Sequence, residues 1–166
     1  YSVYEEYRGF LALNAARAVV HVSTQPGSKD LFIRNDDQLP LATFIAATGL
    51  TVHQIDSTMH TGSGPIRINY NRPPTTALRR QLTMNAWQHG LKIQDTGITG
   101  PGGARRLGTV DPDRPNKPGD VRRIGVDVNR IRALYAVGDF ANQAAFNAWV
   151  AAKIEQVVAH ELSHGC

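Results

Sequence analysis

Apolar residues recur along the chain in short runs, some with the period of a strand and others with the period of a helix. Helical spacing predicts helices at 40–48 and 75–88. Short runs rich in β-branched and aromatic residues predict strands at 31–33, 50–55, 65–70, 91–94 and 123–128. Strands mixed with helices of uneven length favour an α+β fold with a small, twisted, mixed sheet over a regular alternation of strand and helix.

The last element is the most regular one. Either Asp139 or Asn142 can cap its start, and it runs to His164, with Gly165 as a plausible stop. At 100° per residue, one stripe holds the large apolar side chains, Phe146, Val150, Ile154 and Val157, with Trp149 at its edge. We therefore predict a long amphipathic C-terminal helix whose stripe packs on the sheet.

Residues 96–120 interrupt this pattern between two ordered halves. The sequence TGITGPGGARRLGTVDPDRPNKPGD is rich in turn formers and has little apolar periodicity, so we predict a long surface loop. With 166 residues, 42% of them hydrophobic, the chain has enough apolar material for one domain over 1–166. It begins with Tyr1 instead of Met and stops at Cys166, just after its strongest motif, so we expect this domain to be incomplete.

Composition narrows the function classes. A single cysteine excludes an internal disulfide framework and a multi-cysteine zinc site. No apolar run reaches the roughly 18 to 20 residues of a membrane-spanning helix, so we expect no membrane span. The net charge is +4, and the arginine doublets are scattered without interleaved aromatic residues, so we expect no nucleic-acid partner. These doublets are Arg79-Arg80, Arg105-Arg106 and Arg122-Arg123.

The strongest motif ends the C-terminal helix. His160-Glu161-Leu162-Ser163-His164 matches HExxH, and residues four apart are neighbours on a helix, so both imidazoles can bind one Zn²⁺. Glu161 lies beside them and can act as the general base that takes a proton from a metal-activated water. Two histidines four apart can also be hydrogen-bonded residues that the helix dipole favours. The apolar stripe running into the motif and the glycine after it favour the metal site.

The segment VVAHELSHG resembles the active-site helix of the zincin metallopeptidases. The resemblance implies a zincin-like domain, His160 and His164 as zinc ligands, Glu161 as the catalytic glutamate, and a peptide or protein substrate. The opening YEEYRGF, with KDLFI downstream, is similar to the start of bacterial, often secreted, proteins that end in such a helix. That likeness implies a secreted or extracytoplasmic protein, and a Ca²⁺ site before this segment with Glu6 as its last ligand.

The third zinc ligand is missing from the pattern, because the chain ends two residues after His164. It lies beyond Cys166 or is absent. The other histidines are expected to be structural or surface residues: His21, His53, His60 and His89. Cys166 is expected to be a small residue after the turn.

The sequence thus predicts zinc-dependent hydrolysis of peptide bonds in the complete domain, with the present piece inactive by itself. An edge strand would bind an extended substrate through its backbone. The first alternative is a non-catalytic secreted binding or adhesion module of the same shape, and a more distant one is an arginine-rich nucleic-acid binder. Substrate preference and oligomeric state are not encoded in any pattern that we detect.

Overall fold

The computed structural model describes residues 9–24, 27, 29–57, 59, 90–98, 106–112 and 121–164. The chain forms two compact units, one of Tyr1–Asp36 with Gly49–Lys92 and the other of Asp37–Thr48 with Ile93–Cys166. The chain thus passes between the units after Asp36, after Thr48 and after Lys92. The expectation of a single domain over 1–166 stays a prediction.

The first unit contains β1 (Phe10–Leu13), β2 (Val19–Val22), β3 (Asp30–Asn35) and β4 (Thr51–Ile55). The strand order is β2-β1-β4-β3. Strand β1 pairs antiparallel with β2 and β4, whereas β3 and β4 are parallel. One cluster of buried hydrophobic side chains consists of Phe10, Phe32, Ile55 and Met59. Strands β3 and β4 confirm the predicted runs, and the β1–β2 hairpin was not predicted.

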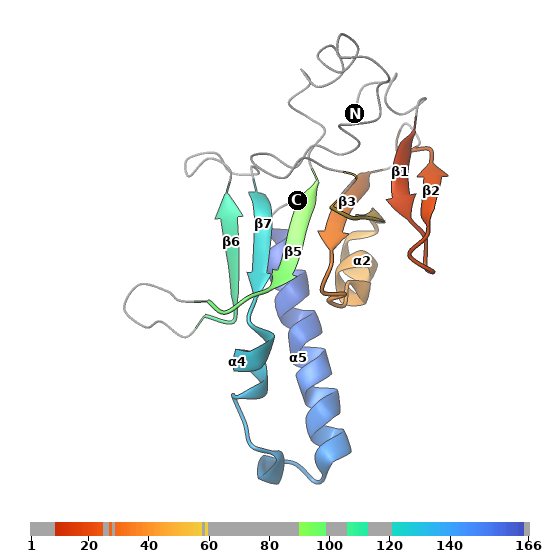
Figure 1. Cartoon of the computed structure of the whole chain (residues 1–166). Helices are drawn as coiled ribbons and strands as arrows, with labels where there is room; N and C mark the ends of the chain where they lie inside the picture. The colour runs from red at the N-terminus through yellow and green to blue at the C-terminus, as the bar shows by residue number, and fades with distance from the viewer. Residues whose placement is uncertain are drawn as a thin grey trace. The chain divides into compact units, whose positions relative to one another are not determined.

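The second unit positions the candidate site. It contains α2 (Ala42–Thr48), β6 (Gly108–Pro112), β7 (Val121–Val126), α4 (Val128–Arg132), the 3₁₀ turn η2 (Val137–Asp139) and α5 (Gln143–Ser163). The strand order is β5-β7-β6, where only the last three residues of β5 (Leu91–Asp95) belong to this unit, and β6 is antiparallel to β7. Helix α5 packs on β6, β7, α2 and α4 (Figure 1).

Helix α5 confirms the predicted C-terminal helix almost to the residue. Asn142 is its N-cap, and the Asn142 side chain accepts a hydrogen bond of 2.9 Å from the backbone N–H of Ala145. The predicted stripe is buried at Val150, Ile154 and Val157, and half-buried at Phe146. Two side chains outside the predicted stripe are fully buried: Val158, in the apolar run expected before His160, and Leu162, which was not predicted. The apolar face therefore continues through the HExxH motif.

Polar contacts join α5 and α4 to their neighbours within the second unit. Glu155 Oε1 on α5 accepts a hydrogen bond of 3.0 Å from the backbone N–H of Thr43 in the first turn of α2. Asp127, which is buried, caps α4 by accepting a 2.8 Å bond from the Arg130 N–H, and its other oxygen accepts from the Ile98 N–H. The bonds from Thr43 and Arg130 satisfy backbone donors that the first turn of a helix leaves without an intrahelical partner, and the bond from Ile98 ties its segment to the start of α4.

Two predicted ranges need correction. Within the predicted loop 96–120, Gly108–Pro112 forms strand β6, because this edge strand gains its hydrogen bonds from β7, which follows later in the chain. The strand predicted at 123–128 lies two residues earlier, at Val121–Val126 (β7). Asp127 caps the next helix, so Val128 is the first residue of α4. The predicted elements at 65–70 and 75–88 lie outside the described residues.

The described chain is α+β, with seven strands in parallel and antiparallel pairs and a long C-terminal helix. Among its described residues, no helix combines the length and the apolar character needed to cross a membrane.

Candidate metal centre

The last turn of α5 brings the two motif histidines together. His160 Nε2 and His164 Nε2 are 3.4 Å apart, and the ring centroids are separated by 4.9 Å with the ring planes nearly perpendicular. Both side chains are exposed to solvent. The helix ends here: the C-cap residue His164 donates its N–H to the Glu161 carbonyl three residues back, as in a 3₁₀ turn, and Ser163 Oγ donates to the His160 carbonyl. The two Nε2 atoms therefore lie close together at the end of the helix.

The separation between the two nitrogens fits a shared zinc ion. Two nitrogens that bind one tetrahedral zinc at about 2.0 to 2.1 Å lie about 3.3 to 3.4 Å apart. A direct hydrogen bond between the imidazoles is the competing explanation; at 3.4 Å it would be longer than the roughly 2.7 to 3.2 Å that is usual for N–H···O bonds. Both rings are exposed, so water can satisfy their polar atoms without a bond between them. The spacing of the two nitrogens therefore fits a shared zinc ion and also allows a long hydrogen bond between the rings.

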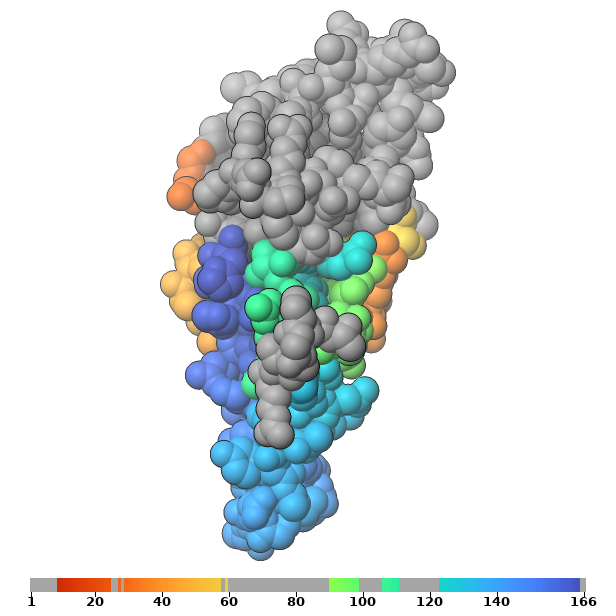
Figure 2. All heavy atoms as spheres, turned by 90° about the vertical axis from the view of Figure 1, so that its left-hand side faces the viewer, coloured from red at the N-terminus to blue at the C-terminus, as the bar shows by residue number. Residues whose placement is uncertain are grey.

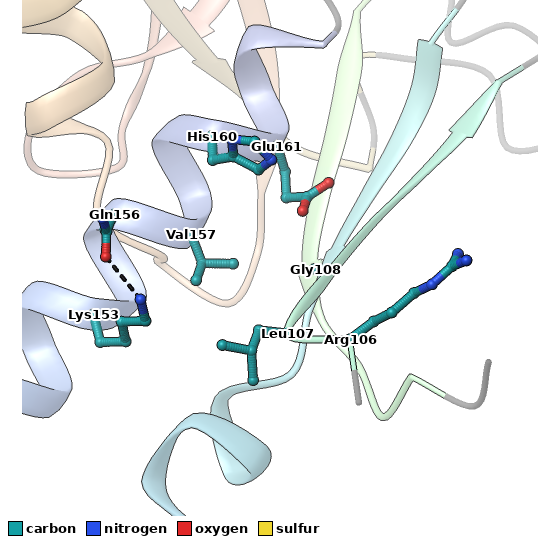
Figure 3. A pocket seen from close by; sticks show the side chains of 8 residues that line it. All are labelled: Arg106, Leu107, Gly108, Lys153, Gln156, Val157, His160 and Glu161. Carbon is teal, nitrogen blue, oxygen red and sulfur yellow. Dashed lines mark hydrogen bonds between the residues drawn. The ribbon is translucent and has the colours of Figure 1, made fainter. Parts of the chain in front are cut away.

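Glu161 lies next to His160, with its side chain directed toward β6. The side chain is half-buried, and its carboxylate lies over Gly108 at the start of that strand (Figure 3). A Cβ atom on Gly108 would come within 3.0 Å of three atoms of this side chain, Oε1, Cγ and Cδ. The carboxylate therefore occupies space that any other residue at position 108 would fill.

A pocket of about 460 Å³ opens beside His160 and Glu161, and α5 and the start of β6 line it. Val157 and Leu107 face each other across its apolar part, and the Lys153 ammonium donates a 2.9 Å hydrogen bond to Gln156 Oε1 at its margin (Figure 3). Figure 2 shows the end of α5, in dark blue, at the surface beside β6, in green. Within the described strands, β6 is the end strand of its unit, so one edge of it is not paired with β7.

The buried part of α5 holds the motif in place. Val158 and Leu162 are both fully buried, four residues apart, and Leu162 lies between the two histidines in sequence. Ligands on a helix whose neighbouring residues are locked in the core are held more accurately than ligands on a loop. The sequence predicted this anchoring for Val157 and the residues before it, and the structure extends it to the last turn.

The other candidate residues either belong to the first unit or lie outside the described residues. In the first unit, His53 Nε2 lies 2.7 Å from Asp30 Oδ1 and the His53 ring stacks on Phe32, which suits a structural histidine. His21 lies in β2, beside Gly9. The remaining candidates fall outside the described residues: Glu6, His60, His89, Gly165 and Cys166. The described part of the chain contains no group of three or more His, Cys, Asp or Glu residues that could hold a metal ion.

Sequence reasoning missed Gly108 as a part of this site. It is one of several glycines in the 96–120 run, and no local signal separates it from the others. Only the approach of α5 to β6 reveals its contact with Glu161.

Comparisons with models of protein families, with curated proteins and with solved structures find no match to this chain.

Proposed function

We propose that this chain provides the active-site helix of a zincin-type metallopeptidase, which hydrolyses peptide bonds with zinc. His160 and His164 are its zinc ligands and Glu161 is its general base. The observation that supports this most directly is the 3.4 Å separation of the two Nε2 atoms, which suits a tetrahedral zinc ion.

The roles follow from the chemistry of the side chains. Zinc, when bound, supplies Lewis-acid polarisation of a carbonyl and acidifies water. Neutral imidazoles hold the metal through Nε2, and the rigid helix fixes the direction from which they do so. Glu161 is not needed as a ligand. Its carboxylate lies over Gly108 and lines the same pocket as His160, and its proposed role there is to take a proton from the attacking water and return it to the leaving amine.

The surroundings suit an extended peptide. Among the described strands, β6 has one edge that no strand pairs with, and its backbone groups can bind a substrate strand; the pocket lined by Leu107 and Val157 can accept an apolar side chain next to the scissile bond. Catalytic zinc sites use three protein ligands and keep a further position open. The proposal therefore requires a third ligand from residues outside the described ranges. Secretion and the N-terminal Ca²⁺ site, which the likeness of YEEYRGF implies, remain parts of the same proposal.

The test uses the longest natural form of the chain, loaded with one equivalent of zinc, and a mixture of quenched fluorescent peptides. We expect hydrolysis by the unmodified protein and a loss of about 10² to 10⁴-fold in Glu161→Gln, with zinc still bound, because Gln keeps the size of Glu but cannot accept the proton. Glu155→Gln is the matched control. It lies on the same helix, and Gln keeps an oxygen that can accept the Thr43 N–H bond, so activity should stay unchanged.

Two results would contradict the proposal. Near wild-type cleavage by Glu161→Gln would exclude Glu161 as the base. Zinc binding without cleavage of any peptide would favour the non-catalytic binding module.

A further inference from the structure

Gly108 is the first residue of β6, where it is in register with Val126 of β7. Among the described glycines, a positive φ angle is found at Gly9, Gly27 and Gly49, and not at Gly108. Another residue could therefore adopt this backbone conformation without strain. The reason for a glycine at this position has to be sought in the space around it.

That space is filled by one side chain. The three atoms nearest to a Cβ built on Gly108 all belong to Glu161, and the carboxyl carbon Cδ would lie at 2.5 Å. Ordinary van der Waals contact begins near 3.4 Å, so the carboxyl carbon would have to move by about 0.9 Å or more. Glu161 is a half-buried, flexible side chain, so it can give way more easily than the strand can.

We infer that Gly108 is a positioning residue for Glu161: by having no side chain, it lets the carboxylate rest against the start of β6, in the pocket that His160 also lines. The effect of this contact on catalysis rests on the proposed function, in which Glu161 is the general base. A general base must lie within about 2.6 to 3.2 Å of the group whose proton it takes. A displacement on the order of 1 Å can lower a rate by about 10²-fold. A methyl group at position 108 therefore acts mainly on catalysis, through Glu161.

The experiment compares Gly108→Ala with Gly97→Ala in the zinc-loaded, longest natural form of the chain. Gly97 belongs to the same unit and also lacks a positive φ, but a Cβ there would meet nothing within 4 Å. For Gly108→Ala we expect kcat to fall by about 10 to 100-fold, with KM and zinc content unchanged. Gly97→Ala should match the wild type. In the Glu161→Gln background, Gly108→Ala should cause no further loss, because the base is already gone.

A second readout needs no catalysis. The melting temperature is measured for Gly108→Ala with Glu161 present and in a Glu161→Ala background, where the space is free. We expect the substitution to lower Tm more in the presence of Glu161, by about 1 °C or more, because contacting residues couple and 1 kcal/mol corresponds to about 2 to 4 °C at this chain length. Wild-type kcat in Gly108→Ala, or equal Tm shifts in both backgrounds, would overturn the inference. If the wild type cleaves no peptide, the proposed function fails, and the Tm comparison alone decides whether Gly108 makes room for Glu161.

Discussion

Replacing Leu162 by Ala tests whether the last turn of α5 is held by the core. Leu162 is fully buried, and the substitution removes three carbon atoms. At about 0.8 kcal/mol per buried CH₂ group, the transfer contribution is roughly 2.4 kcal/mol. The cavity left behind adds to this, and Leu→Ala changes in cores cost about 2 to 5 kcal/mol in total. For a chain of 166 residues this corresponds to a fall in Tm of about 4 to 20 °C.

The assay is thermal unfolding followed by circular dichroism, with Leu134→Ala as the matched control. Leu134 is 39% exposed, so the same chemical change there should cost less than about 1 kcal/mol. Leu162 also lies between His160 and His164, so Leu162→Ala should release zinc faster during dialysis against a chelator. Equal losses of stability in the two variants would show that the motif is not anchored in the core, and the rigidity assigned to the metal site would be wrong.

Three further predictions concern the same helix and the proposed zinc site. Val157→Ala should cost about 1 to 3 kcal/mol in urea unfolding and weaken zinc retention, because Val157 is buried just below the motif; an unchanged midpoint would contradict its packing. Asn142→Ala should cost about 0.5 to 2 kcal/mol through the lost N-cap bond, whereas Asn142→Asp should keep most of the stability; equal losses would argue against the cap. Zinc at about 100 times its Kd should stabilise the folded protein by about 2.7 kcal/mol, seen as a higher Tm, and a Tm independent of zinc would argue against a folded site.

Local signals were enough to predict the elements that carry the motif. The stripe of Val150, Ile154 and Val157 repeats with the period of a helix, and Asn142 is a good N-cap, so α5 could be predicted almost to its ends. The pairing of the two histidines follows from the same geometry, because residues four apart share one face of a helix. These features depend on neighbours in sequence, which a pattern can record.

The features that sequence reasoning missed depend on distant partners. The strand Phe10–Leu13 is held by β2 and β4, and a turn in which Arg17 adopts a positive φ and Asn14 Oδ1 accepts from the Ala18 N–H joins it to β2. Strand β6 lies in a run of turn formers and is a strand because β7 pairs with it. The contact of Gly108 with Glu161 needs both this pairing and the packing of α5. No periodicity within one segment contains that information.

Zinc content after dialysis tests the central claim most directly. The longest natural form of the chain and its His160→Ala/His164→Ala double variant are loaded with zinc, dialysed side by side, and measured by mass spectrometry of the metal. If the two Nε2 atoms that lie 3.4 Å apart share a metal ion, the unmodified protein should keep one zinc per chain and the double variant should keep none. Equal zinc in the two proteins, with both folded by circular dichroism, would contradict the assignment of the site.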